Sequence, residues 1–254
     1  MQMQPEDSTE AAATTLHLRR PVVRELSVGG FVPLSSTDFP GQLAAVVFCQ
    51  GCPWRCGYCH NPHLQPPRSD GQIRWSVLRE ALSRRRGLLD AVVFSGGEPT
   101  AQTALRRAME EVRGMGFRVG LHTAGIYPRR LERLLPMADW IGFDVKAEFA
   151  DYETVTGVRG SGVPAIESLG MVIGSGIDCE VRTTAHPRLM SPPAMMRLAA
   201  ALARLGVKRY VVQEFRAQGC ADRGLREQRS AGYPDEDLFR DIARLFETFE
   251  IRRA

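Results

Sequence analysis

Four of the six cysteines fall within eleven residues, in the stretch Cys49-Gln-Gly-Cys52-Pro-Trp-Arg-Cys56-Gly-Tyr-Cys59. Thiolates are soft ligands, and they favour zinc or an iron–sulfur cluster. The spacing Cys52-x3-Cys56-x2-Cys59 places three thiolates in one short loop. Three ligands cannot fill the four irons of a cubane, so one iron would stay open to another molecule.

A structural zinc loop that uses Cys49 as the fourth ligand is the alternative. Closed zinc sites normally take pairs of ligands from separated segments, so four ligands from eleven contiguous residues would be cramped. We therefore predict that Cys49 packs at the end of a strand and that Cys179 belongs to the core. Cys220 lies in a polar segment, and the sequence assigns no role to it.

A second unusual segment, Ser95-Gly96-Gly97-Glu98-Pro99, follows an apolar run. A pair of glycines after a strand lets the backbone approach a ligand closely and expose its amides and carbonyls. Alone, the segment could be a simple turn. It comes one strand–helix unit after the cysteine loop, and this placement indicates a ligand that both segments share.

The elements that must position these segments are six apolar, β-branched or aromatic runs, at residues 43–48, 91–94, 117–122, 140–145, 179–184 and 209–215. Helical patterns separate most of them, and Ser191 followed by Pro192 predicts the start of one helix. We expect the last helix to carry Leu238, Ile242, Leu245, Phe246 and Phe249.

Strands that are apolar on both faces and alternate with helices predict a parallel sheet covered by helices. Six such units are fewer than the eight of a closed TIM barrel. We therefore expect an α/β fold that is an open, partial (β/α)6 TIM-like barrel, with a doubly wound sheet as the alternative. Ligands in either fold bind at the carboxyl ends of the strands.

The unusual polar residues all follow predicted strands at that edge. After the cysteine loop and Gly96-Gly97-Glu98, the next strand ends carry residues 122–125, then Asp144 and Lys146, then residues 182–186, and last residues 213–216; His122 and Arg182 begin two of these ends. We predict that these side chains converge on one site.

The composition is ordinary for a globular protein. The 254 residues are 44% hydrophobic and 24% charged, with a net charge of +4, which does not predict a nucleic-acid partner. We expect residues 1–22 to be a disordered tail and residues 23–254 to be a single domain. No apolar run is long enough to span a membrane and no signal peptide is evident, so we expect a cytoplasmic protein.

The two motifs together resemble the radical S-adenosylmethionine (SAM) superfamily, with CPWRCGYC as the CxxxCxxC signature and SGGEP as the Gly-Gly-Glu motif. The segment GFVPLSSTDFPGQLAAVVFCQGCPWRCGYCHNPHL further resembles the activating enzymes of glycyl-radical enzymes, and within them those of anaerobic ribonucleoside-triphosphate reductase. The resemblance covers roughly residues 26 to 216.

The resemblance implies a [4Fe–4S] cluster on Cys52, Cys56 and Cys59, with SAM on the open iron. It also implies SAM contacts from Tyr58 to the adenine, from Gly96, Gly97 and Glu98 to the ammonium, from Lys146 to the carboxylate, and from Arg182 to the ribose or carboxylate. A plain salt bridge between strands is the alternative for Lys146 and for Arg182. Related activases often read Asp-Thr-Asn-Gly where this chain reads His122-Thr-Ala-Gly125, so His122 departs from the pattern. Asp144 and Lys146 match the family's Asp-x-Lys.

The implied reaction is reductive cleavage of SAM to a 5′-deoxyadenosyl radical, which removes a hydrogen from a glycine of a partner enzyme. The expected partners are anaerobic ribonucleotide reductase and a one-electron donor such as flavodoxin or ferredoxin. The alternatives are a pyruvate formate-lyase-type partner, a small-molecule substrate, or a non-catalytic zinc or iron–sulfur binding module.

Overall fold

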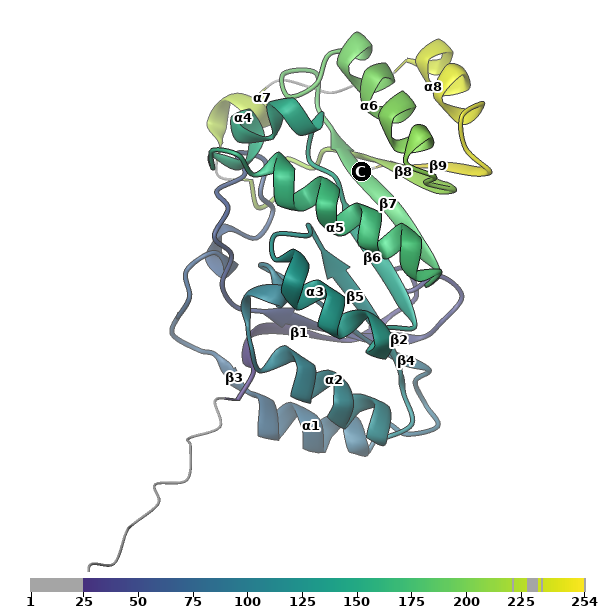
Figure 1. Cartoon of the computed structure of the whole chain (residues 1–254). Coiled ribbons are helices and arrows are strands. Elements are labelled where there is room, and N and C mark those ends of the chain that lie inside the picture. The colour runs from purple at the N-terminus through teal and green to yellow at the C-terminus, as the bar shows by residue number, and fades with distance from the viewer. Residues whose placement is uncertain (1–24, 221, 228–232, 234, 254) are drawn as a thin grey trace, which may run out of the picture.

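A computed structural model describes residues 25–220, 222–227, 233 and 235–253, so the prediction for residues 1–22 lies outside the described part. The described residues form a nine-stranded sheet with the order β3-β1-β2-β4-β5-β6-β7-β8-β9 (Figure 1). The strands are β1 (Ser27–Ser35), β2 (Ala44–Cys49), β3 (Ile73–Arg74), β4 (Ala91–Gly96), β5 (Arg118–Thr123), β6 (Trp140–Asp144), β7 (Cys179–Ala185), β8 (Arg209–Glu214) and β9 (Thr248–Arg252).

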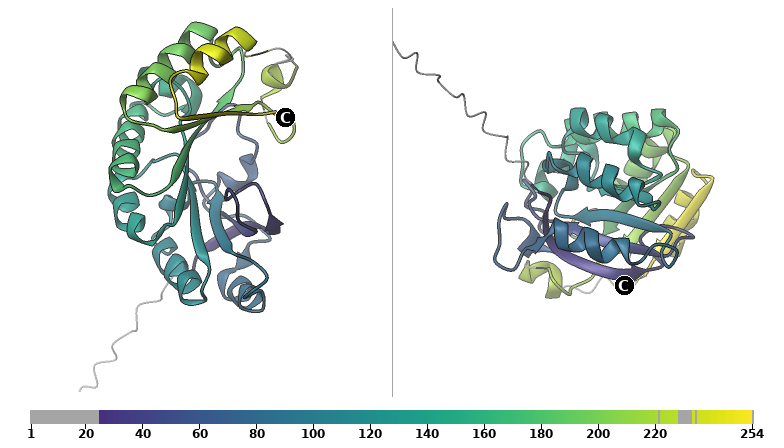
Figure 2. Two further views of the ribbon diagram at one scale, coloured as in Figure 1. Left: turned by 90° about the vertical axis from the view of Figure 1, so that its right-hand side faces the viewer. Right: turned by 90° about the horizontal axis from the view of Figure 1, so that it is seen from below.

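The strands from β2 to β9 in this order are parallel, and they include all six predicted runs. The sheet curves without closing, and helices cover its convex side (Figure 2). The open, partial barrel is therefore confirmed. Because neighbouring strands are parallel and in register, their carboxyl ends lie along one edge.

The helices are α1 (Trp75–Ser83), α2 (Leu105–Gly114), α3 (Pro128–Leu134), α4 (Tyr152–Thr156), α5 (Gly162–Ser175), α6 (Pro192–Arg204), α7 (Arg223–Glu227) and α8 (Glu236–Ala243). These helices form because they bury an apolar face. In α1, for example, Trp75, Leu78 and Leu82 are all buried. The predicted start of α6 is confirmed, because the Ser191 side chain accepts a hydrogen bond from the Ala194 amide.

The structure corrects one predicted element and adds a strand. The predicted last helix ends at Ala243, and residues 248–252 instead form β9, in which Phe249 and Ile251 alternate with polar residues. The six predicted runs do not include β1, a nine-residue strand antiparallel to β2. In α5, the buried face carries Leu169 and Val172, while Ile166 is 39% exposed.

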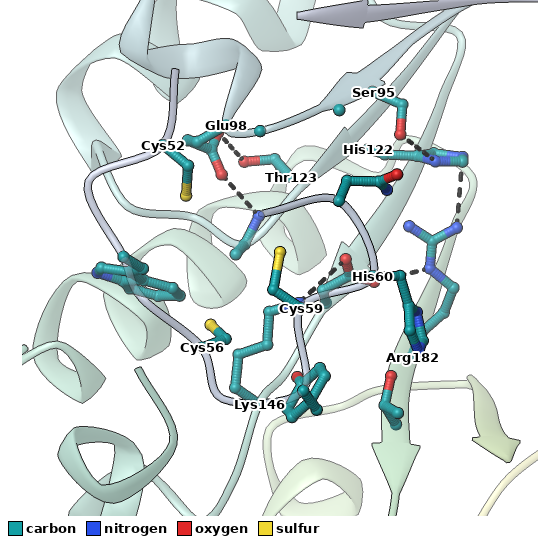
Figure 3. Close-up of a pocket in the computed structure, with 18 of the residues that line it drawn as sticks. Cys52, Cys56, Cys59, His60, Ser95, Glu98, His122, Thr123, Lys146 and Arg182 are labelled. Carbon is teal, nitrogen blue, oxygen red and sulfur yellow. Dashed lines mark hydrogen bonds and ion pairs between the residues drawn. The ribbon is translucent and has the colours of Figure 1, made fainter. Parts of the chain in front are cut away.

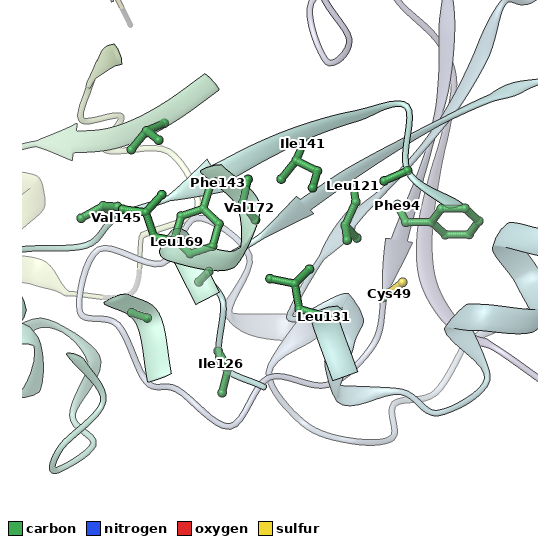
Figure 4. Packing of buried hydrophobic residues seen from close by; sticks show 14 of the residues in the cluster. Cys49, Phe94, Leu121, Ile126, Leu131, Ile141, Phe143, Val145, Leu169 and Val172 are labelled. Carbon is green, nitrogen blue, oxygen red and sulfur yellow. The ribbon is translucent and has the colours of Figure 1, made fainter. Parts of the chain in front are cut away.

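Two hydrophobic clusters lie on the two faces of the sheet. The larger one fills the space between the sheet and the helices (Figure 4). The smaller one lies inside the barrel near the amino ends of the strands, where Phe39 stacks on Trp140 at 5.3 Å between ring centroids. The Arg118 guanidinium lies 5.3 Å from the Phe39 ring, and this packing forms a floor beneath the site.

No helix among the residues described here has the length and apolar character needed to cross a membrane.

Candidate active site

The carboxyl ends of the parallel strands surround a cavity of about 340 Å³ (Figure 3). It brings together all eleven residues that the sequence predicts for the site: Cys52, Cys56, Tyr58, Cys59, Gly96, Gly97, Glu98, His122, Asp144, Lys146 and Arg182. They come from the loop after β2 and from the ends of β4, β5, β6 and β7.

The loop that carries the three cysteines is fixed by main-chain hydrogen bonds. The Cys52 amide donates to the Gln65 carbonyl at 3.0 Å, and the Cys59 amide donates to the Cys56 carbonyl at 3.0 Å. All three thiols are free and half-buried. Within the described ranges, no three His, Cys, Asp or Glu side chains are close enough to hold a single metal ion. The three thiols line one cavity, and thiolates are the ligands that iron–sulfur clusters use.

The surroundings of Cys52 and Cys56 favour the protonated thiol in the protein alone. Burial raises the pKa of Cys52 to about 12, and the Glu98 charge adds to this shift. Burial also raises the pKa of Cys56, while the Lys146 ammonium opposes it. A bound metal group favours the thiolate form of these two side chains.

The other cysteines have different surroundings. Cys49 is 0% exposed and packs in the larger hydrophobic cluster, which confirms its predicted packing role (Figure 4). Cys179 is only partly buried at the start of β7, so its assignment to the core holds only in part. Cys220 is buried, and its thiol donates to the Gly57 carbonyl at 3.4 Å.

The glycine pair brings the end of β4 against the end of β2. A Cβ atom at Gly96 would lie 2.5 Å from the Cys49 nitrogen, and one at Gly97 would lie 2.5 Å from the Gly51 oxygen. The amides of Gly97 and Glu98 donate to the carbonyls of Cys49 and Gly51, each at 2.9 Å. The close approach that requires glycine here is therefore to the neighbouring backbone.

Glu98 is 1% exposed and holds the turn from inside. Its carboxylate accepts hydrogen bonds from the Thr100 amide at 3.1 Å, the Thr123 hydroxyl at 2.7 Å and the Ala124 amide at 3.0 Å. Burial raises the pKa of Glu98, and these hydrogen bonds oppose that rise. Glu98 thus ties the end of β4 to the end of β5.

His122 lies at the floor of the cavity and contacts Asp38, Ser95 and Arg182. Its Nε2 lies 2.9 Å from the Asp38 carbonyl and its Nδ1 lies 3.2 Å from the Ser95 hydroxyl. We assign the proton to Nε2, because this tautomer donates to Asp38 and accepts from Ser95. Burial and the Arg182 charge lower the pKa of His122 to about 4, so it is neutral at pH 7. Arg182 Nη1 lies 3.3 Å from Nε2 and cannot donate to that nitrogen in this tautomer.

Asp144 lies between two cations. Arg182 Nε is 2.9 Å from one carboxylate oxygen and Lys146 Nζ is 3.3 Å from the other. Burial alone would raise the pKa of Asp144, but the two cations hold it well below its usual range. Gly142 makes room for Arg182, since a Cβ there would meet the guanidinium at 2.8 Å. Lys146, Arg182 and Asp144 together form a charged wall of the cavity, which carries one net positive charge.

Tyr58 is buried between the cysteine loop and this charged wall. Its ring is 5% exposed, and Lys146 Nζ lies 5.6 Å from the ring centroid. Burial raises the pKa of the Tyr58 hydroxyl, so the ring is neutral. A cation over an aromatic face fixes the relative position of the two side chains.

Several other residues line the cavity, and the sequence analysis gives none of them a role. Thr184 belongs to the predicted strand end at residues 182–186, and it lies on the same face of β7 as Arg182. Asp38 arrives from the turn between β1 and β2, and no local signal predicts its position. The remaining ones are Trp54, His60, Asn61, Ser95, Thr123, Ala124, Ile126 and Gln213.

Comparison with known proteins agrees with this geometry. Residues 46–190, more than half of the chain, match the family model of the radical SAM superfamily. The chain is 27% identical over 225 residues to a Methanocaldococcus jannaschii protein described as a glycyl-radical enzyme activating enzyme, covering 86% of this chain and 90% of that protein. It is 31% identical over 146 residues to a pyruvate formate-lyase-activating enzyme of Clostridium pasteurianum, covering 54% of this chain and 61% of that enzyme.

Solved structures share the fold at low sequence identity. Streptococcus suis SuiB, solved with its precursor peptide SuiA, has a TM-score of 0.66 at 13% identity, over 82% of this chain and 48% of SuiB. QueE from Escherichia coli has a TM-score of 0.54 at 16% identity, over 90% of this chain and 94% of QueE. This chain thus spans about half the length of SuiB and nearly all of QueE.

Proposed function

The chain belongs to the radical SAM superfamily, and we propose that it generates a glycyl radical on a partner enzyme. Enzymes of this superfamily use a [4Fe–4S] cluster and SAM. When bound, the cluster supplies the electron that cleaves SAM to methionine and a 5′-deoxyadenosyl radical. The observation that carries the proposal is the convergence of three free thiols and the Gly-Gly-Glu turn on one cavity.

Cys52, Cys56 and Cys59 would hold the cluster, because they are the cysteines that line the cavity. The burial of Cys49 disfavours a closed zinc site, because a cysteine packed in the hydrophobic cluster is not available as a fourth ligand.

The charged wall and the turn give SAM two polar anchors. The net positive charge of Lys146, Arg182 and Asp144 suits the methionine carboxylate. The amides of Gly97 and Glu98 already donate to carbonyls at the end of β2. We therefore assign the ammonium contacts to carbonyl oxygens of Gly96 and Gly97, supported by the Glu98 carboxylate.

The remaining residues shape the cavity. Tyr58 would pack near the adenine, because its ring is buried beside the cysteine loop. His122 has both ring nitrogens occupied by Asp38 and Ser95, so we assign it to the floor of the site and not to direct SAM binding. Buried walls of this kind exclude water and protect a reactive radical.

For the partner we propose anaerobic ribonucleotide reductase, on the resemblance of residues 30–64 to its activating proteins. A pyruvate formate-lyase-type partner is the second candidate, favoured by the 31% identity to the Clostridium pasteurianum activating enzyme. In both cases a flavodoxin or ferredoxin would deliver the electron.

The first experiment is anaerobic reconstitution with iron and sulfide, followed by dithionite and SAM. We expect a reduced-cluster EPR signal that SAM perturbs, together with release of 5′-deoxyadenosine. Cys56→Ala should abolish cleavage, because it removes one of three ligands. Cys49→Ala is the matched control and should retain iron. Zinc in place of iron, or unchanged cleavage by Cys56→Ala, would refute the proposal.

The second experiment identifies the partner. The reduced protein with SAM is mixed with an anaerobic ribonucleotide reductase or with a pyruvate formate-lyase, and the glycyl-radical EPR doublet is measured. We expect the doublet on the reductase. A doublet on the lyase alone would replace our partner with the second candidate, and SAM cleavage without either doublet would indicate another substrate.

A further inference from the structure

The cysteine loop is held from outside by the segment that follows β6. The Arg55 amide donates to the Thr156 carbonyl at 2.8 Å, and the Gly57 amide donates to the Val155 carbonyl at 3.3 Å. Both carbonyls belong to α4, a helix of five residues. The two donors lie on either side of Cys56, so α4 determines where this part of the loop lies.

One side chain of α4 reaches both the cysteine loop and the strand end that carries Lys146. The Tyr152 ring meets the Trp54 ring edge to face, with centroids 5.8 Å apart and an interplanar angle of 76°. Its hydroxyl oxygen accepts a hydrogen bond from the Lys146 amide at 3.0 Å. Tyr152 is 1% exposed, so neither contact competes with solvent.

Tyr152 is itself fixed in place. The Phe149 ring stacks on it at 5.6 Å with an interplanar angle of 14°. The Thr156 hydroxyl donates to the Tyr152 carbonyl at 2.9 Å, and Gly157 ends the helix with a φ of 67°. A rigid, buried ring with two partners on different elements keeps those partners at a constant separation.

We propose that Tyr152 is a positioning residue, which sets the place of the cysteine loop relative to Lys146. The proposal rests on the function proposed above, in which the cysteines hold the cluster and Lys146 contacts the SAM bound to it. If the loop shifts relative to Lys146, the cluster and the ammonium group no longer fit the same SAM molecule. Tyr152 does not line the cavity, so its effect is indirect.

The test compares Tyr152→Phe with the wild-type protein and with Tyr127→Phe. The first variant removes only the hydroxyl that accepts from Lys146. The control removes the hydroxyl of a tyrosine whose ring contacts Arg130 away from the cysteine loop. Each reconstituted protein is titrated with SAM, and the EPR signal of the reduced cluster gives the Kd. Iron content and thermal stability are measured in parallel.

We expect Tyr152→Phe to bind wild-type amounts of iron while its Kd for SAM rises about fivefold, the factor for one lost hydrogen bond. The SAM-induced change in the EPR signal should also differ from wild type. Tyr127→Phe should match the wild type in all three measurements. A Tyr152→Phe protein with lower thermal stability but unchanged Kd and EPR change would show a merely structural role and overturn the proposal.

A second measurement does not depend on the cluster. In reduced, cluster-free protein, iodoacetamide should alkylate Cys56 about fivefold faster in Tyr152→Phe than in wild type, because the loop is less restrained. Equal rates would contradict the proposal. If the wild type binds neither iron nor SAM, the proposed function fails, and the alkylation comparison still tests the positioning. If Tyr152→Phe is insoluble, Trp54→Leu takes its place. It removes the contact between the Trp54 and Tyr152 rings, and it must raise the alkylation rate of Cys56 to a similar extent.

Discussion

At the scale of single residues, His122 shows how a departure from a family pattern can be accommodated. The sequence identifies the position but not its partners, because Asp38 comes from a turn 84 residues earlier in the chain. The neutral ring satisfies Asp38 and Ser95 at once. The same neutrality makes His122 a source of pH-dependent stability.

We expect the free energy of unfolding to fall as pH falls from 6.5 to 4. The pKa of His122 is about 4 in the folded protein, against 6.5 for a histidine exposed to water. Between these pH values the unfolded chain therefore binds a proton that the folded protein does not bind. The loss is at most about 3 kcal/mol. Chemical denaturation at several pH values checks this, and His122→Asn should show a smaller loss. Equal slopes for both proteins would contradict the assignment.

The glycine pair is a second residue-scale lesson. The sequence predicts correctly that the backbone makes a close approach there, but it cannot tell whether the approach is to a ligand or to another strand. The register between β2 and β4 decides this, because it places Cys49 beside Gly96. Register is a tertiary property, and no local pattern encodes it.

Gly97→Ala should destabilise the protein by about 3 kcal/mol, since its Cβ would lie 2.5 Å from the Gly51 oxygen and neither backbone can move freely. Gly114→Ala is the matched control. It lies at the end of α2 with no atom within 4 Å of the new Cβ, and it should stabilise slightly. Thermal denaturation of both variants tests the contrast, and similar melting temperatures would argue against the close approach.

At the scale of elements, the sequence-based prediction is wrong for β9, which it assigns to the last helix. Leu238 and Ile242 have helical spacing, and Leu245 and Phe246 continue that spacing beyond the end of α8. Phe249 belongs to β9, in which side chains alternate with a period of two. The six central strands and most of the helices are predictable, because their apolar runs are long and bounded by turns. The strands that the six runs do not include are β1, β3 and β9, at the two ends of the sheet order, and pairing with neighbouring strands determines them.

The edge strand contributes to stability through one ion pair. Glu180 on β7 is 1% exposed, and both of its oxygens accept from Arg252 on β9, at 2.6 and 2.9 Å. Arg252→Met should cost about 2 kcal/mol, because it leaves a buried carboxylate unpaired at a partly exposed edge. Arg240→Met, which breaks an exposed pair with Asp237, should change little. Equal effects in urea denaturation would contradict this account.

At the scale of the whole molecule, the site is assembled from neighbouring strand ends and not from one segment. The sheet order β2-β4-β5-β6-β7 brings the loop after β2, the Gly-Gly-Glu turn and the charged wall together in sequence order. This is why the sequence alone could predict which residues meet. Their hydrogen bonds depend on side-chain packing, so they could not be predicted.

A ligand held by several strand ends should stabilise the whole sheet. SAM at about one hundred times its Kd should raise the free energy of unfolding of the reconstituted protein by about 2.7 kcal/mol. Hydrogen exchange should slow most at the ends of β4, β5 and β6, where binding also suppresses local openings, and least at amides of α1 that exchange by local opening. Thermal melts with and without SAM measure the first effect. A uniform slowing across all helices would argue against a localised site.

The floor of the barrel has a consequence for the order of events. Phe39, stacked on Trp140 beneath Arg118, fills the end of the barrel at which the strands begin. SAM therefore cannot enter through this end, and it must reach the cavity from the carboxyl ends of the strands or through the side on which the sheet stays open. We expect the partner's glycine loop to approach the carboxyl ends, because the cavity lies there. In the proposed reaction, SAM that enters at the carboxyl ends must bind before the partner covers them.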